Sequence, residues 1–109
     1  MKFNSQICTS REQSERLLAL GLKKETADCG IYYSELAGCD RMFAKIETEF
    51  EADEIPAWSL HRLIEIVAHT QYPYYVISKE LPIYDALCER IEWLIKEGYF
   101  NKEYLNGNN

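Results

Sequence analysis

Two histidines and a glutamate recur at four-residue intervals near the middle of the chain, at His61, Glu65 and His69. On a helix these positions share one face, and two histidines that bind the same metal ion normally lie four residues apart. Eight residues span about 12 Å of helix axis. Because that span is too long for one ion, we interpret the three side chains as a polar outer stripe containing a Glu65–histidine pair.

The four cysteines, Cys8, Cys29, Cys39 and Cys88, have irregular gaps and contain no Cys-x-x-Cys pair. Structural zinc sites usually contain closely spaced ligand pairs, so the sequence predicts no metal site and no cofactor. We expect the thiols to stay reduced and Cys88 to be a small core or boundary residue. Nucleophile-elbow and phosphate-loop patterns do not occur, so no catalytic residue is predicted, with a small enzyme of unrecognised site as one alternative.

The most unusual local feature is a row of acidic side chains. It lies in residues 42–53, where acidic and basic side chains alternate with mostly apolar ones. This alternation predicts a β-strand with one apolar and one charged face. Alternate residues on one strand face lie about 6.6 Å apart, so the carboxylates would form a line of negative charge. Such a line either discourages aggregation of sheet edges or provides a surface for a basic partner. The candidate partner surface consists of Glu47, Glu49, Glu51, Asp53 and Glu54.

Three helices are predicted to position these groups, over residues 10–20, 59–68 and 83–97. Ser10 followed by Gln13 forms a capping box at the first helix start, and Gly21 is suited to the left-handed position after its end. Apolar residues recur at helical spacing in the second and third segments. Residues 72–78 are rich in β-formers and are predicted to form a strand, whereas Ile31–Tyr33 is expected to be a brief strand or a packed loop.

These elements predict a single α+β domain over residues 1–105, with a frayed tail at 106–109. About three helices pack on a small, mostly antiparallel sheet of two to four strands. The apolar faces of the elements supply the expected core. The core residues are Leu17, Leu20, Ile46, Phe50, Trp58, Leu63, Ile64, Val67, Leu87, Ile91, Leu94 and Ile95.

The 109-residue chain has a formal net charge of -6, which on average repels a phosphate backbone. Nucleic acid is therefore a disfavoured partner. The first nine residues contain no apolar stretch typical of a signal peptide, and no segment has the apolar length of a membrane span. We therefore expect a cytoplasmic protein with no membrane association, for which a homo-oligomer is possible.

A helix-turn-helix is a further alternative for residues 10–28, where a helix, a glycine and a second segment follow one another. The second segment would have to carry basic or amide side chains into the major groove. Lys23 and Lys24 are followed by Glu25 and Asp28, so this segment has little net positive charge. We therefore favour an ordinary helix end followed by a loop.

Three blocks of the sequence together resemble a group of small uncharacterised proteins from prophages and conjugative elements of gut anaerobic bacteria. The blocks are TSREQSERLLALGLKKETAD at 9–28, IPAWSLHRLIEI at 55–66 and DALCERIEWLIKEGYF at 85–100. Members of that group pair a Gln-Ser-x-x-Leu helix with a Pro-x-Trp-Ser-Leu helix start and a late amphipathic helix. The resemblance implies a related fold and a mobile-element setting, and it transfers no site residue.

The leading functional hypothesis is therefore a non-enzymatic accessory protein of a mobile genetic element that acts by binding an unidentified protein. The acidic row motivates this hypothesis. A small DNA-binding regulator that uses the region from Leu22 to Asp28 is the alternative, and a small enzyme is the second alternative.

Overall fold

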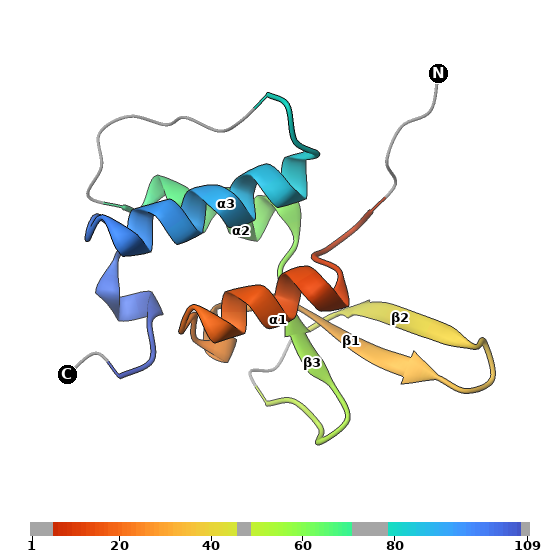
Figure 1. Cartoon of the computed structure of the whole chain (residues 1–109). Coiled ribbons are helices and arrows are strands. Elements are labelled where there is room, and N and C mark those ends of the chain that lie inside the picture. The colour runs from red at the N-terminus through yellow and green to blue at the C-terminus, as the bar shows by residue number, and fades with distance from the viewer. Residues whose placement is uncertain (1–5, 46–48, 71–78, 108–109) are drawn as a thin grey trace.

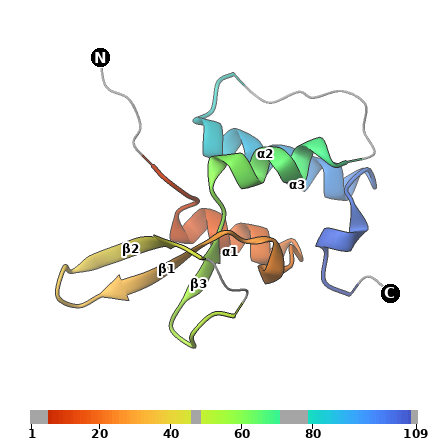
Figure 2. The ribbon, with the colours of Figure 1, turned by 180° about the vertical axis from the view of Figure 1, so that it is seen from behind.

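A computed structural model describes residues 6–45, 49–70 and 79–107 of the chain. The described elements are three α-helices and a three-stranded antiparallel sheet, which confirms the predicted α+β class. The helices gather on one side of the molecule, and the hairpin of the first two strands extends away from them (Figures 1 and 2). None of the helices in the described ranges is long and apolar enough to cross a bilayer.

Helix α1 (Arg11–Ala19) begins at the predicted capping box. The Gln13 backbone N–H donates to Ser10 Oγ at 3.2 Å, and the Ser10 backbone N–H donates to Gln13 Oε1 at 2.9 Å. These two bonds satisfy donors that the first turn of a helix leaves without an intrahelical partner. The helix is followed by Gly21 at a φ of 99°, a conformation that costs glycine little.

Helices α2 (Leu60–Ala68) and α3 (Ile83–Lys96) also lie within one residue of their predicted ends. Ser59 caps α2 by accepting a hydrogen bond from the backbone N–H of Arg62. Asp28 holds this cap from the other side, because its carboxylate accepts bonds from both the backbone N–H and the hydroxyl of Ser59. The start of α2 is thereby fixed to the residue that immediately precedes the first strand.

Strand β1 (Cys29–Ser34) is the centre of the sheet, between β2 (Cys39–Ala44) and β3 (Ile55–Ala57). Ile31 pairs with Met42 on one side and with Ile55 on the other. The expected element at Ile31–Tyr33 is thus a strand. The predicted strand at 72–78 lies outside the described residues.

The prediction of one long strand over 42–53 was wrong, because β2 ends at Ala44 and residues 49–54 form loop and turn. Alternation of side chains makes a strand only where a neighbour supplies backbone partners. Among the described residues, the last such partner is the carbonyl of Asp28, which accepts from the Lys45 N–H at 2.8 Å. The side chain of Asp28 caps α2, so β1 begins only after it, at Cys29.

The main core lies between the helices and contains seven of the predicted residues, while Leu20 and Ile95 pack at its margin. Phe50 is half-buried and Ile46 lies outside the described residues. Ile64 is 40% exposed, so its assignment to the core was wrong, and the α2 residue that is buried in its place is Ile66, at 2%. The core residues that the sequence analysis missed include Leu22, Ile66, Tyr84 and Phe100.

A second, smaller core lies on the inner face of the sheet, where Cys8, Cys29, Ile31 and Ala57 are buried together. Arg11 of α1 reaches this side of the hairpin and pairs with Asp40 of β2 through two bonds of 2.9 and 2.7 Å. The opposite, outer face of the sheet carries Tyr32, which is 38% exposed. The buried cluster of the sheet therefore lies on its inner face.

Candidate functional site

The two histidines of the predicted polar stripe belong to different interactions: His61 lies on α2, and His69 caps its end. His61 is exposed and its Nε2 lies 3.2 Å from Glu65 Oε1, so the predicted Glu65–histidine pair is present. His69 Nδ1 instead hydrogen-bonds the hydroxyl of Tyr104 at 3.0 Å. Among the described residues no group of three His, Cys, Asp or Glu side chains is placed to hold a metal ion.

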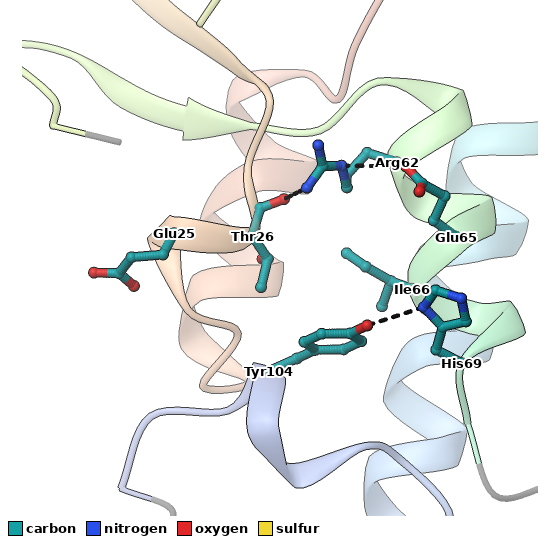
Figure 3. A pocket seen from close by; sticks show the side chains of 7 residues that line it. All are labelled: Glu25, Thr26, Arg62, Glu65, Ile66, His69 and Tyr104. Carbon is teal, nitrogen blue, oxygen red and sulfur yellow. Dashed lines mark hydrogen bonds and ion pairs between the residues drawn. The ribbon is translucent and has the colours of Figure 1, made fainter. Parts of the chain in front are cut away.

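A cavity of about 210 Å³ lies beside this stripe, between α2, the 3₁₀ helix η1 (Lys24–Thr26) and the 3₁₀ helix η2 (Lys102–Tyr104). Figure 3 shows Arg62 and the His69–Tyr104 pair on opposite sides of Ile66, with Glu25 pointing away. The Arg62 guanidinium lies 3.5 Å from Glu65 and donates to the carbonyl of Thr26 at 3.3 Å. Its charge is therefore already balanced by protein groups.

Thr26 has the one aliphatic hydroxyl group among the residues that line this cavity. This hydroxyl also makes its hydrogen bonds within the protein. It accepts from Trp58 Nε1 at 2.9 Å and donates to the carbonyl of Lys23 at 2.6 Å. A nucleophile needs a neighbouring base to accept its proton, and the Thr26 hydroxyl donates to a backbone carbonyl instead. The hydrogen bonds around this cavity connect three chain segments. We therefore interpret the cavity as a structural contact between α2 and the 3₁₀ helices.

The cysteine side chains are divided between the two cores and the surface. Cys88 is buried in α3, and burial raises the pKa of its thiol to about 11. Cys8 and Cys29 are buried together, and their hydrogen bond together with burial raises the pKa of the Cys29 thiol. Cys39 alone among the four is exposed. Three of the thiols are therefore shielded from solvent. Of these three, Cys88 was predicted to be a core or boundary residue.

The helix-turn-helix alternative requires a second helix soon after α1. Residues 22–28 hold only the three-residue helix η1, and β1 begins directly afterwards at Cys29. The segment is thus an ordinary helix end followed by a loop, as we favoured from its charge.

The candidate partner surface does not form a straight row. Glu49, Glu51 and Asp53 are exposed on the loop between β2 and β3, and Glu47 lies outside the described residues. Glu54 differs from the rest, because its carboxylate accepts from the Glu51 backbone N–H at 2.7 Å and lies 3.4 Å from the Lys45 ammonium. The side chain of Glu54 is 17% exposed, so it holds the loop rather than facing solvent.

An aromatic cluster on the outer face of the sheet adjoins this loop, and sequence patterns did not reveal it. The rings of Tyr32 and Phe43 have centroids 5.9 Å apart. The Lys45 ammonium lies 4.9 Å from the Phe50 ring centroid and 5.7 Å from that of Phe43. This cation therefore bridges the loop to the sheet, and the acidic residues next to Phe50 border the aromatic cluster.

Gly30 allows the Phe43 ring to lie directly against the backbone of β1. A Cβ atom at Gly30 would come within 2.3 Å of Phe43 Cζ. Gly30 pairs with Phe43 across the ladder, so the small residue and the large ring occupy one cross-strand position. A glycine opposite an aromatic residue on paired strands is the sequence signal that could have located this cluster once the register was known.

No family model matches the chain, and no curated protein and no solved structure is significantly similar to it.

Proposed function

We propose that the protein is a non-enzymatic binding module that recognises another protein through the outer face of its sheet and the adjoining acidic loop. The observation that supports this proposal most directly is the exposed ring of Tyr32 beside the half-buried ring of Phe43 on the outer face of the sheet. Large exposed apolar groups that are bordered by charges are typical of interaction sites. Tyr32 is 38% exposed although it lies in the central strand.

The partner should combine an apolar or aromatic side chain with basic residues. The apolar group would cover the rings of Tyr32 and Phe43, while lysine or arginine would approach the exposed carboxylates of Glu49, Glu51 and Asp53. Opposite charges at the rim of an interface steer association and fix orientation. The same carboxylates disfavour a nucleic acid, whose phosphates they would repel.

A selection from a random linear peptide library tests this chemistry. Wild type should enrich peptides that contain lysine or arginine together with an aromatic residue. The triple variant Glu49→Gln, Glu51→Gln, Asp53→Asn keeps the size of each side chain and removes the charge, so it should lose the basic component of the selected motif. Failure to enrich any motif, or enrichment of the same basic motif by the triple variant, would contradict the proposal.

The setting that we propose is a mobile genetic element, for which the protein would be an accessory factor in the cytoplasm. The three blocks that resemble prophage and conjugative-element proteins support this part. The genes that flank the coding sequence test it directly. Neighbours that encode phage or conjugation functions would support it, whereas an operon of ordinary chromosomal metabolism would argue against it.

A further inference from the structure

Among the described strands, β2 lies at one edge of the sheet. The strand order places β1 on one side of β2 and no strand of the described ranges on the other. The hairpin that carries β2 extends away from the helices in both views (Figures 1 and 2). A free edge presents unpaired backbone donors and acceptors that can template another strand.

The hydrogen-bond pattern identifies which residues form this edge. Lys45 donates its backbone N–H to Asp28, on the side of β1. In an antiparallel ladder the N–H and C=O of one residue point to the same side, and successive residues alternate. Phe43 and Arg41 therefore bond to β1, whereas the backbone groups of Met42 and of its second neighbours in the strand point outward.

We propose that this edge pairs with the β2 edge of a second copy of the chain, in an antiparallel arrangement centred on Met42. The two sheets would join into one continuous six-stranded sheet. A groove of about 510 Å³ lies beside β2, and Ile7 and Met42 are among the residues that line it. Ile7 is 63% exposed, and the added strand would cover part of it.

Charge selects this register from the self-pairings that the edge allows. Centring on Arg41 places two arginines opposite each other, and centring on Phe43 places Arg41 opposite Lys45 of the second copy. Like charges at directly opposed positions are destabilising. Centring on Met42 instead places Arg41 opposite Phe43 of the second copy, on the outer face, where a guanidinium is attracted to a ring.

The three remaining registers are also disfavoured. Centring on Asp40 opposes two carboxylates. Centring on Cys39 or on Ala44, the two end residues of β2, leaves most of the strand unpaired. With Met42 at the centre, Asp40 opposes Ala44 of the second copy and five residues of each strand are paired. Asp40 also keeps its bonds to Arg11, because these lie on the inner face.

Sedimentation over a range of protein concentrations, under reducing conditions that exclude disulfide dimers through Cys39, tests the pairing. Wild type should show a reversible monomer–dimer equilibrium. Met42→Pro removes an outward N–H that β1 does not use, and should weaken the dimer by roughly tenfold or more because two symmetric hydrogen bonds are lost. Met42→Leu keeps the N–H and is the matched control, for which the dimer should persist.

The register is tested by Arg41→Gln, an exposed substitution that does not depend on Met42→Pro folding normally. In the register centred on Met42 this substitution weakens the dimer, because the contact with the Phe43 ring is lost. In the two registers that oppose Arg41 to a cation it would strengthen the dimer. A strengthened dimer, a wild-type protein that stays monomeric, or a dimer that both substitutions leave unchanged would each overturn the proposal.

The pairing and the proposed recognition of a basic partner share the Phe43 ring, but different substitutions test them. The triple variant Glu49→Gln, Glu51→Gln, Asp53→Asn should dimerise like wild type, since these residues lie outside β2. A monomeric protein that nevertheless selects basic aromatic peptides would overturn the pairing alone. A dimer that selects no peptide would contradict the binding proposal alone.

Discussion

The packing of α2 is most sharply tested by two isoleucines that lie two residues apart on the same helix. Ile66 is 2% exposed and belongs to the main core, whereas Ile64 is 40% exposed. Substitution of either by alanine removes the same atoms from the same helix. The difference between the two variants therefore isolates burial from helix propensity and from the chemistry of the side chain.

Ile66→Ala should lower the free energy of unfolding by about 2–5 kcal/mol, because it removes buried methyl groups and leaves a cavity between α2 and its neighbours. Ile64→Ala should cost about 1 kcal/mol or less. Its side chain is partly in water already, and alanine has the higher helix propensity by a few tenths of a kcal/mol. The expected gap between the variants is thus about 1–4 kcal/mol.

Urea unfolding followed by tryptophan fluorescence measures this gap, since Trp58 is fully buried in the same core. The denaturant slopes of the two variants should match that of wild type, so that the midpoints report stability alone. Equal costs, or a larger cost for Ile64→Ala, would refute the packing described for α2. That second result is the one that the helical periodicity of the sequence predicted.

Three further predictions concern the sheet and the thiols. Gly30→Ala should lower the free energy of unfolding by about 1–3 kcal/mol, because the new methyl group displaces the Phe43 ring. Unchanged stability in urea would show that the ring does not lie against this glycine. Hydrogen bonds from Arg11 hold the pKa of Asp40 below its usual value. This pair therefore stabilises the fold at pH values above the pKa of the unfolded carboxyl. The stabilisation is lost as the pH falls through the pKa of the folded carboxyl. Urea titrations between about pH 3 and pH 7 should therefore show a smaller acid-induced loss for Asp40→Asn than for wild type, and identical losses would argue against the pair. In the native protein a thiol reagent should modify Cys39 rapidly and the three buried cysteines only on unfolding; rapid modification of a second thiol would contradict their burial.

The helices were predictable from sequence because their signals are local. Ser10 and Gln13 form a capping box within four residues, and Ser59 caps α2 in the same way. The buried face of α2 was not predictable to the residue. Ile64 and Ile66 are chemically identical, and Ile66 is buried on the side where α2 meets η2, a contact with residues almost forty positions later in the chain.

The sheet was harder to predict because its pairing depends on distant residues. The side chains do alternate over 42–53, but the strand β2 ends at Ala44. That residue pairs with Cys29, the first residue of β1. Of the acidic residues that motivated a functional surface, Glu49, Glu51 and Asp53 are exposed on one loop, whereas Glu54 is held by Lys45. Their loop conformation and the aromatic cluster beside them depend on the Lys45–Glu54 ion pair and on the Gly30–Phe43 register, which no local pattern encodes.

We propose that the outer face of the sheet and its acidic loop bind the partner. Titration of isotope-labelled wild type with a peptide from the selection, followed by the backbone amide chemical shifts, tests this surface most directly. We expect saturable changes that cluster at residues 30–34, 41–45 and 49–54. Changes centred on Arg62, His69 and Tyr104 instead would place binding at the cavity beside α2 and contradict it.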